Sequence, residues 1–95
     1  MNDGAEYKAM AKAVLISYPE TKKRGDCPET RAVERALDRQ REYYNGEARV
    51  RMVELVYFRQ SHTLAGAAVA TGYAVETIKK WNLELLSNID GRLGQ

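Results

Sequence analysis

Apolar residues recur with helical spacing along most of the chain, and breaks in that pattern divide it into five segments. From about Ala5 to Ser17 they lie three and four residues apart, at Tyr7, Met10, Ala11, Val14, Leu15 and Tyr18. Pro19 is expected to end this helix, because the residue before a proline is disfavoured in the α region. The polar residues between Pro19 and Pro28 have the composition of a loop.

A second helix is predicted to begin at Pro28, with Asp26 or Cys27 as its cap. Its apolar stripe consists of Ala32, Val33, Ala36, Leu37 and Tyr44. Its other face alternates in charge, through Arg31, Glu34, Arg35, Asp38, Arg39, Arg41 and Glu42. Such a face is typical of a solvated surface, and packing against a charged partner is the alternative. Asn45-Gly46 is expected to end the helix, since both residues tolerate the left-handed conformation.

The third segment, from about Glu47 to Arg59, is apolar on most sides, with Val50, Met52, Val53, Leu55, Val56, Tyr57 and Phe58. A helix with so little polar face is expected at the centre of the core, or shared between the core and a dimer interface. A β-strand from Val53 to Phe58 is the alternative, and the helical pattern on both sides disfavours it.

The last third of the sequence has the spacing of a helix-turn-helix. A short helix from Leu64 to Ala70, with Thr63 as its cap, is followed by Gly72 and a longer helix from Val75 to about Asn88. Ala68 supplies a small residue where the helices cross, and the glycine accepts positive φ in the turn. Ile78, with Trp81 and Leu85 on the same face, points back into the crossing. The alternative is a helical hairpin that packs in this way without touching DNA.

If the motif reads DNA, the second of its helices presents five outward residues to the major groove: Ala74, Glu76, Thr77, Lys79 and Lys80. The lysines suit phosphates or guanine edges, the threonine a base or a phosphate, and the glutamate the amino group of cytosine. Just before the motif, the candidate phosphate contacts are Arg59, Gln60, Ser61 and His62. Solvent-exposed lysines and a loop histidine are the simpler interpretation of the same residues.

Composition narrows the functional classes. With 95 residues the chain makes one domain, divided into a helical pair over 1–46 and the motif-bearing part over 47–95. Its net charge of +2 is too small to indicate a nonspecific nucleic-acid coat. One cysteine and one histidine leave no Cys- or His-based metal site, so neither a metal nor another cofactor is expected. No nucleophile–base pair or phosphate loop points to an enzyme, and the missing signal and membrane-spanning patterns favour a cytoplasmic protein.

Several short strings, in order, resemble the RinA-like and ArpU-like phage transcriptional regulators, whose C-terminal half is similar to region 4 of sigma-70-type factors. These strings are Ser17-Tyr18-Pro19, Pro28-Glu29-Thr30, Val56-Tyr57-Phe58-Arg59, Thr77-Ile78-Lys79-Lys80-Trp81 and Leu93-Gly94. The resemblance implies sequence-specific binding at a phage or prophage promoter, with contact to RNA polymerase.

The leading expectation is therefore an all-α domain of about five helices that regulates transcription by binding duplex DNA. A homodimer over two half-sites is expected, because one such domain buries little surface on DNA. The dimer seam would come from Val50–Phe58 or from the Tyr7–Tyr18 face. Recognition of packaging DNA, as by a small terminase subunit, is a close alternative. A protein-interaction module is the other class, since the Ala-rich helix from Leu64 suits protein contact.

Overall fold

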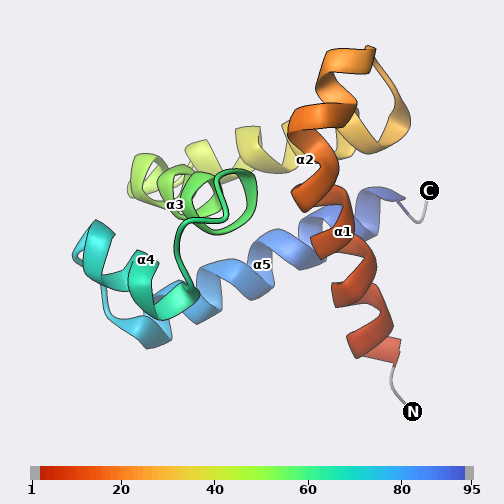
Figure 1. The fold of residues 1–95 in the computed structure, drawn as a ribbon. Helices are drawn as coiled ribbons and strands as arrows, with labels where there is room; N and C mark the ends of the chain where they lie inside the picture. Colours follow the sequence, from red (N-terminus) through yellow and green to blue (C-terminus); the bar gives the residue numbers. More distant parts are fainter. Residues whose placement is uncertain (1–2, 94–95) are drawn as a thin grey trace.

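Residues 3–93 form five α-helices in the computed structural model, and no strand occurs within that range (Figure 1). They are α1 (Asp3–Arg24), α2 (Pro28–Arg41), α3 (Gly46–Val53), α4 (Leu64–Thr71) and α5 (Val75–Leu93). A π-helical segment, η1 (Glu54–Phe58), continues α3 directly. The structure describes side chains from residue 9 to residue 93. The prediction of a small all-α domain is confirmed.

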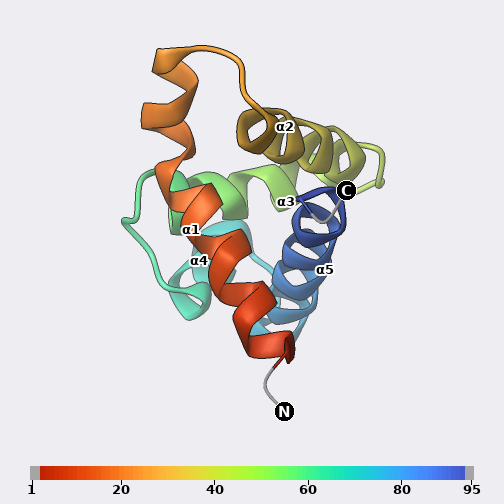
Figure 2. The same cartoon turned by 90° about the vertical axis from the view of Figure 1, so that its right-hand side faces the viewer.

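The long C-terminal helix α5 is the centre of the packing, because each of the other four α-helices contacts it (Figures 1 and 2). Buried side chains from all five helices form one cluster, which includes Leu15, Val33, Met52, Ala67, Trp81 and Ile89. The Cα radius of gyration is 12.8 Å, close to the roughly 12 Å expected for a folded domain of this length. The two halves of the sequence therefore share one core.

Pro19 does not end the first helix, which continues to Arg24. The proline removes the backbone donor that would bond to Leu15, a loss that costs about 3 kcal/mol inside a helix. Contacts with other helices are made on both sides of the proline. The ring of Tyr18 stacks on Phe58 with centroids 5.1 Å apart, and both Tyr18 and Lys22 bond to Glu34 of α2. Only residues 25–27 form the predicted loop.

The boundary between the second and third helices also differs from the prediction. Helix α2 ends at Arg41, and Asn45-Gly46 opens α3 instead of closing α2. Gly46 lies so close to the end of α2 that a Cβ atom would sit 2.6 Å from the carbonyl oxygen of Arg41. The glycine is therefore required for the close approach of two backbones, and its φ is not in the left-handed region.

Two residues placed on apolar stripes are exposed. Met10 is 58% exposed and Tyr44 is 97% exposed. The rest of both stripes is buried or half-buried as predicted, except Tyr7, whose side chain lies outside the described residues. Tyr44 sits in the irregular turn after Arg41, where the helical spacing no longer applies.

Helix ends account for the remaining differences. Helix α5 extends beyond Asn88 to Leu93, while Gly94 lies outside the described residues. Cys27 occupies the N-cap position of α2, but its side chain makes no capping hydrogen bond. Its sulfur instead lies 3.1 Å from the hydroxyl of Thr30, and Asp26 pairs with Arg31.

Candidate nucleic-acid interface

The turn between α4 and α5 forms as the sequence predicts. The Thr63 hydroxyl caps α4 by accepting from the backbone N–H of Gly66 at 3.0 Å. Gly72 takes φ +79° at the other end of the helix, and its N–H donates to the carbonyl of Ala68 at 2.9 Å. A left-handed residue at this position is what allows the chain to reverse within three residues and begin α5 at Val75.

Small and aliphatic side chains meet where α4 and α5 pack together. Ala68 is 3% exposed, Ile78 is fully buried and Trp81 is 2% exposed. Tyr73 covers the tryptophan, with ring centroids 4.6 Å apart. The predicted inward face of α5 is therefore confirmed, and the first turns of this helix are held firmly to the core.

The outward residues of α5 lie on the opposite side of those turns. Ala74, Glu76, Lys79 and Lys80 are exposed, whereas Thr77 is half-buried. Among the described residues, no carboxylate forms an ion pair with either lysine. The two ammonium groups are thus available to an anionic partner. Glu76 is the one acidic side chain among the five outward residues.

The residues before α4 are placed by the π-helical segment. The backbone N–H of Arg59 bonds to Glu54 at 2.7 Å, and those of Ser61 and His62 both bond to the carbonyl of Leu55. Gln60 adopts φ +53°, a left-handed conformation rare for a residue with a side chain. π-Helical turns and strained residues of this kind concentrate at functional segments.

Within this connection, the Ser61 hydroxyl lies 2.8 Å from Nδ1 of His62. Arg59, Gln60 and Ser61 are exposed and His62 is half-buried. These residues precede α4 and the α5 residues follow it, so the 8 residues of α4, about 12 Å of helix, lie between the two stretches along the chain. No hydrogen bond or ion pair joins the two stretches in the part of the chain that the structure describes.

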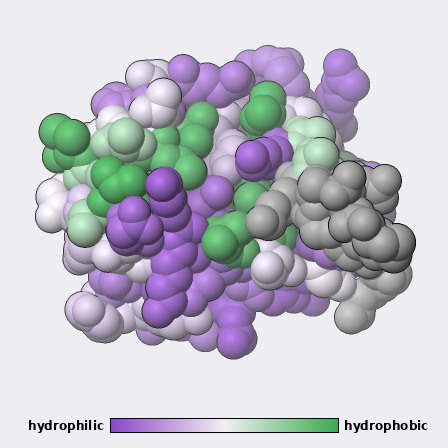
Figure 3. All heavy atoms as spheres, turned by 90° about the horizontal axis from the view of Figure 1, so that it is seen from below, coloured by the Kyte–Doolittle hydropathy of each residue, from purple (hydrophilic) through white to green (hydrophobic). Residues whose placement is uncertain are grey.

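The outer face of α4 is apolar. Val69 is 84% exposed, and Ala65 and Ala70 beside it are exposed as well. Figure 3 shows a hydrophobic group of side chains at the end of the molecule where α4 and the start of α5 lie, with hydrophilic side chains next to it. The candidate interface is therefore mixed: basic on α5 and apolar on α4.

A buried arginine on α3, which the sequence did not single out, contacts both α2 and α5. Arg49 is 6% exposed and pairs with Glu84 of α5 at 2.7 Å. It also donates to Gln40 at 2.9 Å and Asn45 at 3.0 Å, and its guanidinium lies 3.8 Å from the centroid of the Tyr43 ring. This one side chain ties α2, α3 and α5 together. Little in the sequence indicates this role, because Arg51 lies two residues further along the same helix and is exposed.

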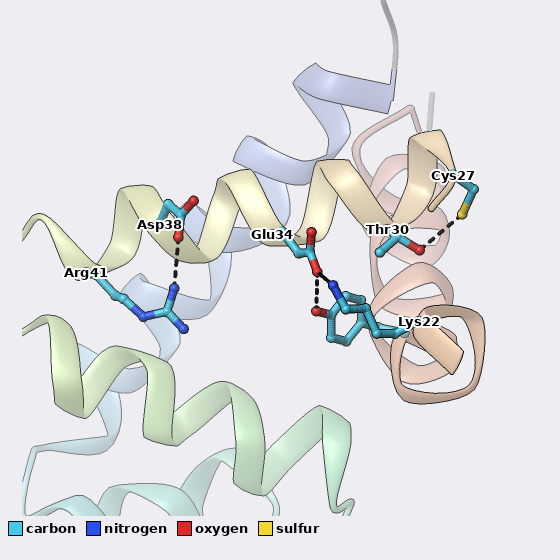
Figure 4. A network of polar contacts seen from close by, with 7 residues as sticks. Lys22, Cys27, Thr30, Glu34, Asp38 and Arg41 are labelled. Carbon is cyan, nitrogen blue, oxygen red and sulfur yellow. Dashed lines mark hydrogen bonds and ion pairs between the residues drawn. The ribbon is translucent and has the colours of Figure 1, made fainter. Parts of the chain in front are cut away.

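A second polar network joins α1 to α2 (Figure 4). Glu34 accepts from both Lys22 and Tyr18, and these bonds lower the pKa of its carboxyl group. Burial and the same carboxylate raise the pKa of the Tyr18 phenol. The Lys22 ammonium is more than half exposed, so its ion pair adds little stability. The network orients the end of α1 beyond Pro19.

The described residues contain neither a helix with the length and apolarity of a membrane span nor a cluster of three metal-ligating side chains. No family model, curated protein or solved structure matches this chain.

Proposed function

We propose that this protein binds duplex DNA through the first turns of α5 and acts as a transcriptional regulator of the phage type that its sequence resembles. One observation carries the proposal: α5 divides into a buried face that locks it to α4 and an exposed face with Lys79 and Lys80 unpaired among the described residues. A rigid helix that presents cations at the end of a tight turn has the form of a helix-turn-helix recognition helix.

Each exposed residue then has a role that its chemistry allows. Lys79 and Lys80 contact phosphates or guanine edges, and Glu76 accepts from the amino group of cytosine. Ala74 suits the methyl group of thymine. Thr77 is half-buried, so its hydroxyl serves a phosphate at the edge of the groove.

The loop before α4 supplies a second set of backbone contacts. Arg59 offers a guanidinium, and Ser61 and His62 lie directly before the N-terminus of α4. Phosphates are stabilised at helix N-termini by free backbone N–H groups. Along the chain, α4 lies between these contacts and those of α5.

A homodimer would enlarge this small DNA interface, and the sequence offers two seams for it, Val50–Phe58 and the Tyr7–Tyr18 face. Met52, Val53, Leu55 and Tyr57 are buried within the chain's own core, which leaves little of the third segment for a partner. On the Tyr7–Tyr18 face Ala11 and Leu15 are buried as well, and Met10, which is 58% exposed, is the side chain of that face most open to a partner among the described residues. RNA polymerase contact belongs to the same proposal.

Protein binding is the second candidate function, favoured by the 84% exposure of Val69 and by the exposed Ala65 and Ala70 on the same helix. An apolar face of this kind suits a protein partner better than a phosphate backbone. Recognition of packaging DNA, as in a small terminase subunit, uses the same α5 surface and differs in the DNA site.

The test is fluorescence anisotropy with random duplex DNA across 50–200 mM salt, comparing wild type with Lys79→Ala/Lys80→Ala. We expect salt-sensitive binding by wild type, and a decrease of about two in the slope of log K against log salt for the double variant. Lys12→Ala/Lys23→Ala removes the same charge from exposed positions on α1 and should leave the slope unchanged.

Absence of wild-type binding at 50 mM salt would refute the DNA proposal. Equal losses in the two double variants would show that binding follows net charge and not the α5 surface. If DNA binding is absent, self-association measured by sedimentation, for wild type and Val69→Glu, tests whether the apolar face of α4 contacts a second copy.

A further inference from the structure

The charged side chains of α2 have different neighbours in the folded chain. Two of its carboxylates are paired with cations, and two of its arginines face the end of α5. Glu34 turns toward α1, where Lys22 and Tyr18 bond to it, and Asp38 pairs with Arg41 at 2.9 Å (Figure 4). With these carboxylates occupied elsewhere, Arg31 and Arg35 stand one helical turn apart on a side of α2 that faces the end of α5.

There the two arginines meet a third. A shallow, open hollow between α2 and the last turn of α5 is lined by Pro28, Arg31, Ala32, Arg35 and Arg92. No acidic side chain lines it. Arg31 pairs with Asp26 at 3.3 Å, a long contact between two largely exposed groups. Among the described residues, neither Arg35 nor Arg92 forms an ion pair.

We propose that this arginine hollow is a binding site for the phosphate group of a small soluble ligand. Three guanidinium groups around one concavity raise the local positive potential, which favours an anion there. The planar guanidinium, with its fork of N–H donors, matches the tetrahedral oxygens of phosphate and forms paired charge-assisted hydrogen bonds with them. The hollow also lies beside the first two turns of α2, the end of a helix that stabilises negative charge.

The site is separate from the proposed DNA surface. Arg92 follows Lys80 by 12 residues on α5, about 18 Å along the helix. A duplex seated on the first turns of α5 would therefore lie at the other end of this helix from the hollow. DNA binding and phosphate binding can be lost independently, so the failure of one proposal leaves the other standing.

The test is a titration of the full ¹⁵N-labelled chain with inorganic phosphate and with pyrophosphate, at constant ionic strength, followed by amide chemical shifts. We expect saturable shifts confined to residues 28–35 and 89–93. Arg35→Gln and Arg92→Gln should each weaken binding about tenfold. Arg39→Gln, on the same helix but outside the hollow, is the matched control and should bind like wild type.

Shifts no larger than those caused by chloride would overturn the proposal. So would an equal loss in Arg39→Gln, which would indicate general charge attraction. The same variants in the DNA anisotropy assay separate the remaining source of phosphate. If Arg35→Gln weakens DNA binding while inorganic phosphate and pyrophosphate do not bind, the hollow contacts a nucleic-acid backbone, and the small-ligand proposal is wrong.

Discussion

Arg49→Met tests whether the buried arginine holds the three helices together. The substitution keeps much of the side-chain volume but removes the guanidinium that bonds to Gln40, Asn45 and Glu84. Gln40 is 1% exposed and its Nε2 already lacks a partner in the structure, so its Oε1 would also become unsatisfied. Breaking a buried ion pair by removing one partner costs about 3–5 kcal/mol.

The expected loss is smaller, because the Glu84 side chain is 34% exposed and water can solvate its carboxylate. We therefore expect the free energy of unfolding to fall by about 2–3 kcal/mol. For a domain of this size that corresponds to a decrease in Tm of roughly 10–20 °C. Urea unfolding followed by circular dichroism gives the free energy, and an unchanged m value would show that both states keep their compactness.

Arg51→Met is the matched control, since this arginine is exposed on the same helix. Its effect should stay within about 0.5 kcal/mol. Glu84→Gln in both backgrounds completes a double-mutant cycle, in which we expect a coupling energy of about 1 kcal/mol or more. An Arg49→Met protein as stable as wild type would refute the reasoning. It would mean that burying the guanidinium costs as much as its contacts return.

Three further predictions concern single side chains. Gly46→Ala should destabilise the fold by about 1–3 kcal/mol, because its Cβ would meet the backbone of Arg41. Gly91→Ala, in the last turns of α5 with nothing within 4 Å of the added carbon, should stabilise the fold by about 0.5–1 kcal/mol. Chemical denaturation distinguishes these two variants, and equal effects would contradict the close approach of the backbone at Gly46. Gly72→Ala should cost about 1 kcal/mol because of its positive φ, and an unchanged melting temperature would argue against this turn. Burial raises the pKa of the Tyr57 phenol above its usual value near 10.0. The unfolded chain therefore loses this proton first, and stability should fall as pH rises above about 10. Tyr57→Phe should weaken that pH dependence in thermal melts. The substitution should itself cost about 1–2 kcal/mol, because it leaves the amide oxygen of buried Asn82 without its partner. An unchanged decrease of Tm with pH above about 10 would exclude Tyr57 as its source.

The features that the sequence predicted correctly are those set within one or two helical turns. Thr63 caps α4, Gly72 takes the left-handed conformation, and Ile78 and Trp81 face inward. Each depends on the residue's own backbone preference or on the 3.6-residue period, both of which can be seen in the chain itself. The exposure of Lys79 and Lys80 follows from the same period.

Other features depended on contacts between residues distant in sequence. Pro19 was expected to end a helix by local rules, yet α1 continues to Arg24, with Tyr18 and Lys22 both bonded to Glu34 of α2. Arg49 became a buried hub only because Glu84, 35 residues away, lies opposite it.

The arginine hollow has the same origin, because Arg92 joins Arg31 and Arg35 only when α5 packs beside α2. The sequence by itself determined which helices and which turn form. Tertiary structure decided where polar groups from different helices meet, because residues far apart in sequence become neighbours only after the helices have assembled. For the buried Arg49 it also decided the strength of the meeting, since the low-dielectric interior exists only in the folded chain.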